Sequence, residues 1–204
     1  MDLNVKRILM LTSSYGLQTA ISSTEYTHIP FSLTPCEFDE QRFNELAAKT
    51  SEFSKVMLKI SKNNEYMYSV LQEVCAMDEF TRNLVNLSKK AKTEGAVQKV
   101  FLGITRNDFM FDRIEKRFIQ VEYNTISASF IHLSSKIADF HRHLQGLKNT
   151  PIDAIENPAT VKCADAFELA YKLNGGKGFV LFIVLANETN LFDQTGLELE
   201  LWKR

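Results

Sequence analysis

The sequence contains few of the residues that mark disulfide-rich or disordered proteins. It has 3 Cys, 4 Pro and 8 Gly among 204 residues. The cysteines, at positions 36, 75 and 163, lie far apart and form no Cys-x-x-Cys pair. Neither a disulfide framework nor a zinc site is therefore indicated. Unpaired cysteines favour a reducing compartment, and we expect a cytoplasmic location.

The sequence also lacks an excess of either charge and any long apolar run. It has 24 basic and 25 acidic residues, for a net charge of -1. A nucleic-acid partner is not expected, because its phosphates would call for a basic surface. The apolar run over residues 8–11 is too short for the core of a signal peptide, and no run is long enough to cross a bilayer. A membrane is therefore not expected as a partner either.

The composition that remains is typical of a folded globular protein. Hydrophobic residues make up 45% and charged residues 24%, and there are 15 Phe. The length lies in the range of one ordinary domain and is sufficient to bury a real core.

Apolar residues at a spacing of three or four predict helices along much of the chain. The segment 22–38, which holds Pro30 and Pro35, is instead predicted to be an extended connection. Asp78 can cap one helix, and Gly95 lies near that helix's end. The predicted helices cover residues 4–17, 39–62, 66–74, 78–95, 132–147, 158–173 and 190–202.

Three segments carry strand signals. Residues 97–104 form a short apolar run, and residues 118–123 alternate apolar and polar side chains. Residues 179–186 are eight consecutive apolar residues rich in β-branched and aromatic types, which predicts a strand buried on both faces. The fold class is therefore α/β, with a helical front part followed by alternating strands and helices. We expect residues 1–38 to form an N-terminal helix and connection, and residues 39–204 the main part.

The clearest candidate site follows the predicted strand 118–123. Glu122 and Asn124 are two residues apart, so on a strand their side chains point to the same side. A carboxylate and an amide oxygen suit Mg²⁺, which prefers oxygen ligands. The segment 127–129, Ser-Ala-Ser, then offers hydroxyl and backbone N–H groups where ligands of α/β sheets tend to bind. The alternative is a strand end followed by a polar turn.

Two further segments are candidates. Arg106 follows an apolar run, and its guanidinium could hold a carboxylate through two parallel hydrogen bonds, or could pair with Asp108. Asn190 and Gln194 are four residues apart and share one face of a predicted helix. Asn190 could instead only cap that helix, with Gln194 solvated.

Two other patterns are interpreted as structural. The glycine-rich segment 174–178 precedes a predicted strand, whereas phosphate loops follow a strand and open a helix, so a helix end and turn are expected. His141 and His143 lie two apart in a predicted helix and cannot bind one metal together. They are expected to pack or to form hydrogen bonds.

Several of these segments together resemble the eukaryotic glutathione synthetases. The two longest are residues 99–111, KVFLGITRNDFMF, and residues 120–130, QVEYNTISASF. The resemblance extends in the same order over nearly the whole chain. The shorter matching segments are residues 28–33, 78–82, 92–95, 141–143 and 190–194.

The resemblance implies an ATP-grasp-type ligase that joins γ-glutamylcysteine to glycine with ATP and Mg²⁺. In that reaction ATP phosphorylates the cysteinyl carboxylate, and the glycine amine attacks the acyl phosphate. Catalysis of this kind is mostly positioning and charge neutralisation. The family also implies a homodimer.

The resemblance further implies roles for single residues. Glu122 would bind Mg²⁺ and lie beside the nucleotide, and Asn124 would be a second Mg²⁺ ligand. Arg106 would meet a substrate carboxylate. Thr189 stands where the family commonly has a basic residue, which makes its role the least secure. The expected γ-glutamylcysteine site comprises Arg106, Ile126, Ser127, Ala128, Ser129, Glu188, Thr189, Asn190 and Gln194.

Other parts of the family's machinery have no counterpart in these residues. Its glycine-rich loop, nucleotide-binding lysines, further magnesium carboxylate and separate substrate domain lie later in the polypeptide. We therefore expect no catalytic residue within this chain and no activity of the chain alone. The alternative is a truncated, non-catalytic paralogue or splice product that acts as a dimerisation or interaction module. An isolated module should hide its apolar faces, whereas a fragment should expose them.

Overall fold

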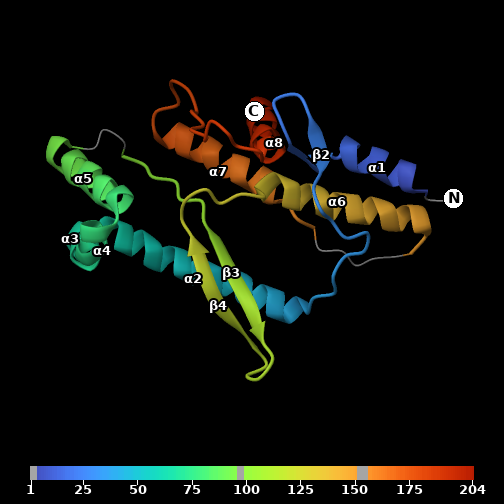
Figure 1. Ribbon diagram of the computed structural model, residues 1–204, viewed down its shortest axis with the longest axis horizontal. Coiled ribbons are helices and arrows are strands. Elements are labelled where there is room, and N and C mark those ends of the chain that lie inside the picture. Colours follow the sequence, from blue (N-terminus) through green and yellow to red (C-terminus); the bar gives the residue numbers. More distant parts are fainter. Residues whose placement is uncertain (1–3, 96–98, 151–155) are drawn as a thin grey trace. The chain divides into compact units, whose positions relative to one another are not determined.

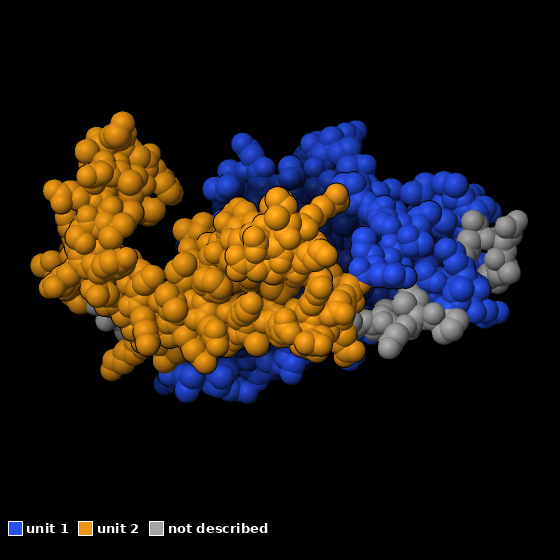
Figure 2. All heavy atoms as spheres, turned by 90° about the horizontal axis from the view of Figure 1, so that it is seen from below, with its two compact units in different colours: residues 1–37, 127–204 blue, residues 38–126 orange. Residues whose placement is uncertain are grey.

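The computed structural model describes residues 4–95, 99–150 and 156–204 (Figure 1). Two compact units make up the chain and are distinguished in Figure 2. Unit 1 comprises Met1–Glu37 and Ser127–Arg204, and unit 2 comprises Phe38–Ile126. The chain passes from unit 1 to unit 2 between residues 37 and 38, and it returns to unit 1 between residues 126 and 127. The expected division of the chain into residues 1–38 and residues 39–204 stays a prediction.

Unit 1 is mainly helical and carries one short hairpin. Its hairpin strands pair antiparallel, with Thr19 opposite Thr27. The buried core consists of Leu17, Leu133, Phe140 and Leu144. The elements are α1 (Val5–Ser14), β1 (Gln18–Ala20), β2 (Tyr26–His28), α6 (Ile131–Lys148), α7 (Ala159–Leu173) and α8 (Leu191–Trp202).

Aromatic rings pack edge-to-face around this core. Phe140 meets Tyr15 and Phe31 at centroid distances of 5.9 and 5.4 Å. Such edge-to-face contacts add to the stabilisation that burial of the rings gives. The rings tie the end of α1 and the segment after β2 to the middle of α6.

Unit 2 contains four helices and a second hairpin. The hairpin lies against α2, because the hydroxyl of Tyr123 shares hydrogen bonds with Ser54 at 2.7 Å and Thr105 at 2.9 Å. Arg42 of α2 also lies 5.3 Å from the centre of the Phe111 ring. The elements are α2 (Glu40–Lys62), α3 (Asn64–Val70), α4 (Gln72–Met77), α5 (Glu79–Glu94), β3 (Arg106–Asp112) and β4 (Arg117–Asn124).

Most predicted helices are confirmed, and the caps explain their starts. The side chain of Asp39 accepts a hydrogen bond from the amide of Arg42, and that of Asp78 accepts one from the amide of Thr81. Gly95 ends α5 with a φ of 84°, which suits glycine. The helix predicted over 66–74 is divided, because α3 ends before Leu71 and α4 begins after it.

Two of the three strand predictions are wrong, and the predicted connection over residues 22–38 is wrong in part. The segment 22–38 contains β2 and is not only a connection. Residues 99–104 form no strand, and residues 97–98 lie outside the described residues; the strand begins instead at Arg106. Only the strand over 118–123 is confirmed, as part of β4.

The segment 179–186 is not a buried strand. No strand is present there, and the exposed fraction is 97% for Phe179 and 89% for Ile183. A strand needs a neighbouring strand to pair with its backbone N–H and C=O groups. Among the described residues, β1 pairs only with β2 and β3 only with β4, so no strand pairs with residues 179–186. The chain is therefore a mixed helix and strand fold without the alternation of strands and helices that we expected after the front part. None of the described helices is long and apolar enough to cross a bilayer.

Candidate substrate and metal site

A polar face on the β3–β4 hairpin brings together four of the chain's charged and amide side chains. Arg106 lies opposite Asn124, and Asp108 lies opposite Glu122. Directly opposed residues of an antiparallel pair point to one side of the sheet, as do residues two apart on a strand. All four side chains therefore belong to one face, the hairpin polar face.

Arg106 is paired within this face. Its Nε donates to Oδ1 of Asp108 at 2.9 Å, and its Nη2 donates to Oδ2 at 3.1 Å. The hydrogen bonds to Asp108 raise the pKa of Arg106. The intramolecular pair that the sequence left open is thus present. The guanidinium of Arg106 already donates two parallel hydrogen bonds to the carboxylate of Asp108.

Glu122 and Asn124 offer oxygen ligands on the same face. Nδ2 of Asn124 donates to Oδ2 of Asp108 at 3.4 Å, which leaves the amide oxygen of Asn124 available. No group of three or more His, Cys, Asp or Glu among the described residues is arranged to hold a metal ion. Glu122 and Asn124 alone could supply one carboxylate and one amide oxygen to a metal ion, and Mg²⁺ usually keeps several waters as its other ligands.

A β-bulge lies beside Glu122. Asp108 faces Glu122, whereas Phe109 faces Gln120, so Val121 has no partner on β3. Bulges re-aim neighbouring side chains and are common next to functional sites. Tyr123 points to the other side of β4, where its hydroxyl bonds hold the hairpin to α2.

The segment 127–129 belongs to unit 1 and directly precedes α6. Ser127 has a φ of 52° and Phe130 a φ of 67°. This left-handed conformation is unfavourable for residues with a β-carbon unless the surroundings hold it. The amides of Phe130, His132 and Leu133 donate to the carboxylate of Asp193 at 2.6, 2.7 and 3.0 Å.

The segment 187–190 is shaped by Glu188. Oε1 of Glu188 accepts from the amides of Thr189 and Asn190 at 2.8 and 2.9 Å. The carbonyl of Thr189 accepts from the amide of Ala20 at 3.0 Å, which ties the segment to β1. The side chain of Thr189 is exposed.

Asn190 and Gln194 have different surroundings. Asn190 precedes α8 without a side-chain cap bond, and its Nδ2 lies 3.5 Å from Oδ2 of Asp193. Gln194 borders a hollow of about 500 Å³ with Val180, Phe182 and other apolar side chains.

The predicted site residues thus fall into two groups, one in each unit. Unit 2 holds Arg106, Glu122, Asn124 and Ile126, and unit 1 holds the serines and residues 188–194. Asp193 joins the start of α6 to Asn190 within unit 1. Sequence reasoning named Asp108 only as a possible partner of Arg106, and it missed Asp193.

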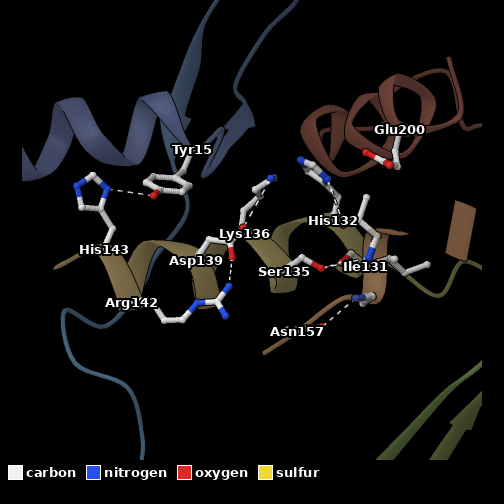
Figure 3. Close-up of polar contacts among 12 residues, drawn as sticks. Tyr15, Ile131, His132, Ser135, Lys136, Asp139, Arg142, His143, Asn157 and Glu200 are labelled. Atoms are coloured by element: carbon white, nitrogen blue, oxygen red, sulfur yellow. Dashed lines mark hydrogen bonds and ion pairs between the residues drawn. The ribbon is translucent and has the colours of Figure 1, made fainter. Parts of the chain in front are cut away.

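Unit 1 also contains a cavity of about 680 Å³ that the sequence reasoning missed and that polar, charged and apolar side chains line together. Figure 3 shows polar side chains from α6 beside it. Asp139 forms ion pairs with Arg142 and, at 3.8 Å, with Lys136. The signal in the sequence was the spacing of three and four residues between His132, Lys136, Asp139 and Arg142.

His141 and His143 of α6 serve as hydrogen-bonding residues, as predicted. Nδ1 of His143 lies 3.0 Å from the hydroxyl of Tyr15, and Nε2 of His141 lies 2.7 Å from the carbonyl of Ser32. Burial, followed by the charge of Lys136, lowers the pKa of His132. Its Nδ1 lies 3.3 Å from Oγ1 of Thr160.

Comparison with known proteins defines the class. Residues 4–177 match the family described as "Eukaryotic glutathione synthase, ATP binding domain". Glutathione synthetase of Dictyostelium discoideum is 35% identical over 188 residues, which cover 86% of this chain and 39% of that protein. Glutathione synthetase of Homo sapiens is 31% identical over 204 residues, covering 97% of this chain and 42% of that protein.

A solved structure gives the same fold. A glutathione synthetase-like effector from Globodera pallida, in its apo form, aligns with a TM-score of 0.71 and 18% identity, over 96% of this chain and 45% of that chain. The chain therefore has a glutathione synthetase-like fold. Because the family match covers most of its length, the chain belongs to the eukaryotic glutathione synthase family. It spans about two fifths of the length of the curated relatives that it matches.

Proposed function

We propose that the chain supplies the amino-terminal part of a glutathione synthetase. The complete ligase would join γ-glutamylcysteine to glycine with ATP as co-substrate. The hairpin polar face is the observation that carries this proposal, because two opposed acids, an amide and an arginine share one side of β3–β4. The names of the curated relatives support the same activity.

The hairpin polar face would hold Mg²⁺. Glu122 and Asn124 would be its ligands, since they place a carboxylate and an amide oxygen on one side of β4. The bound ion would neutralise charge on the ATP phosphates. Asp108 also faces Glu122, and its pairing with Arg106 reduces the repulsion between the two carboxylates.

Substrate-binding roles are proposed for each group of predicted residues by itself. Arg106 would bind a carboxylate of γ-glutamylcysteine. To do so, its guanidinium would have to bind the substrate and Asp108 together, or give up its hydrogen bonds to Asp108. The serines of segment 127–129 would donate hydrogen bonds, and Asn190 and Gln194 would add further ones. Glu188 would act with Oε2, since Oε1 is used by the amides of the segment 187–190.

The remaining parts of the ligation would come from polypeptide that matches the rest of the relatives' length. The family's ATP-binding loop and the glycine site are expected there, with a homodimer as the assembly. A reaction between these substrates involves neither nucleic acid nor a membrane.

A second candidate is a non-catalytic interaction module. Its contact surface would be the exposed apolar side chains of residues 179–185, together with Trp202 of α8, which such a module would have to bury in a partner. Exposed apolar patches of this kind mark interaction surfaces. The same exposure fits the synthetase proposal, in which further polypeptide covers these side chains.

Calorimetric titration of γ-glutamylcysteine into the chain separates the two candidates. The synthetase proposal expects saturable binding that Arg106→Ala weakens about tenfold, a loss of roughly 1.4 kcal/mol. Arg113→Ala is the matched control, because Arg113 is exposed on the turn after β3. Absence of binding to the wild-type chain would contradict the synthetase proposal and favour the interaction module.

A further inference from the structure

One buried carboxylate holds the start of α6 from a position 60 residues further along the chain. Asp193 lies in the first turn of α8 and is only 7% exposed. Its Oδ2 accepts from the amide of Phe130, and its Oδ1 accepts from the amides of His132 and Leu133. These are three of the first amides of α6, which have no partner within the helix itself.

No local group of α6 provides this cap. Phe130 occupies the cap position, makes no side-chain cap bond, and is itself in the left-handed region. The first turn of α6 contains no acidic residue. Asp193 therefore supplies both the acceptor and the negative charge that favour a helix N-terminus.

The bonds of Asp193 reach the segments on both sides of the predicted substrate pocket. The amide of Phe130 directly follows the segment 127–129, whose first residue also has a positive φ. On the other side, Nδ2 of Asn190 lies 3.5 Å from Oδ2 of Asp193. A residue stays in an unfavourable backbone conformation only where surrounding contacts hold it there. The hydrogen bond from the amide of Phe130 to Asp193 is such a contact.

We propose that Asp193 is a positioning residue for substrate binding: it fixes the segment 127–129 and Asn190 relative to each other without contacting substrate. The inference rests on the proposed function for the role of these residues in binding γ-glutamylcysteine. The held conformation of the segment itself does not depend on that function.

Asp193→Asn is the informative substitution because it keeps the size of the side chain. One carboxylate oxygen becomes an NH₂ group, which can only donate. If the NH₂ group replaces Oδ2, it faces the N–H of Phe130, and if it replaces Oδ1, it faces the N–H of His132. Either orientation therefore loses at least one of these hydrogen bonds. The segment 127–129 is then released, while the helices remain packed.

The first measurement uses the ligand-free chain labelled with ¹⁵N. We expect Asp193→Asn to shift the amide signals of Ser127, Ser129 and Phe130 and to speed hydrogen exchange at Phe130 and Leu133. Signals at the far end of α6, near Leu144, should stay in place. Unchanged signals over residues 127–130 would overturn the inference whether or not the chain binds substrate.

The second measurement is calorimetric titration of reduced γ-glutamylcysteine into the same proteins. We expect Asp193→Asn to weaken binding at least tenfold. Leu144→Val serves as the control, because it removes a methylene from the core of unit 1 and has no bond to the segment 127–129. Its affinity should equal that of the wild type.

The outcomes separate the two proposals. Equal affinity of Asp193→Asn and the wild type would overturn the positioning role and leave the proposed function standing. An equal loss in Asp193→Asn and Leu144→Val would also overturn it, because general destabilisation would then explain both. No binding by the wild-type chain would contradict the proposed function and with it the role of Asp193 in binding.

Discussion

The imidazole of His132 lies directly against the backbone of Gly196. A methyl group at position 196 would lie 2.1 Å from Cδ2 of His132 and 2.4 Å from its Nε2. Gly196 is buried in α8, and His132 belongs to the first turn of α6. The close approach of these two helices therefore depends on the absence of a side chain at position 196.

Gly196→Ala is expected to destabilise unit 1. The added methyl would force the ring of His132 and helix α8 apart, and overpacking of this kind costs about 1–3 kcal/mol. Urea unfolding followed by circular dichroism would measure the change in free energy. Gly146→Ala is the control, since no atom lies within 4 Å of that added methyl. It should stabilise the helix by up to about 1 kcal/mol, so equal effects of the two substitutions would contradict the clash.

The stability of unit 1 should fall as the pH drops below about 6.5. Burial lowers the pKa of His132 in the folded chain, with a further contribution from Lys136. Between the folded and unfolded pKa values the unfolded state therefore binds more protons, and the free energy of unfolding rises with pH in that window. The contribution of His132 to the free energy of unfolding is therefore fully present above its unfolded-state pKa. It is lost as the pH falls from that value towards the lower folded-state pKa.

Urea unfolding at intervals between pH 5 and pH 7.5 would test this dependence. We expect His132→Asn to flatten the slope, because the substituted chain has no group there to protonate. His143→Asn is the control at an exposed histidine of the same helix. A slope that survives His132→Asn would assign the pH dependence to other groups.

The helices could be predicted because their signals are local. Asp39 and Asp78 cap amides three residues ahead, and apolar side chains recur at helical spacing after each. The turn after α7 was also predictable: Gly175 and Gly176 have positive φ, and their amides bond to carbonyls of the last helical turn.

The strands were less predictable because a strand depends on a partner elsewhere in the chain. Residues 179–186 have the composition of a buried strand, but no strand of the described residues pairs with them. Conversely, β3 begins at Arg106, which the sequence placed after the predicted strand 97–104, and pairing with β4 decides its structure.

The candidate site was predictable in its residues but not in its contacts. The spacing of Glu122 and Asn124 placed both on one side of a strand, and their register confirms this placement. The cap from Asp193 could not be read from local spacing, because it links positions about 60 residues apart. The metal and substrate roles themselves stay predictions.

Ile183→Lys is expected to reduce self-association of the chain. Ile183 is among the most exposed apolar side chains, so a charge there interrupts the apolar patch at little cost to folding. Static light scattering over a concentration series would measure the change. Phe182→Lys is the contrasting variant, because Phe182 stacks on Phe167 of α7 at a centroid distance of 5.7 Å. It should destabilise unit 1, and unchanged scattering by Ile183→Lys would show that association uses another surface.

Glu122→Gln is expected to weaken metal binding to unit 2. The substitution removes the negative charge but keeps the shape, so the hairpin polar face retains its fold and loses its carboxylate ligand. Mn²⁺ can replace Mg²⁺ as a probe, and its free concentration can be followed by electron paramagnetic resonance. We expect an affinity loss of about tenfold or more. Glu115→Gln is the control, because Glu115 is exposed in the turn between β3 and β4. If both variants bind Mn²⁺ as tightly as the wild type, Glu122 is not a ligand, and the acids of β3–β4 serve only to hold Arg106 and Asn124 in place.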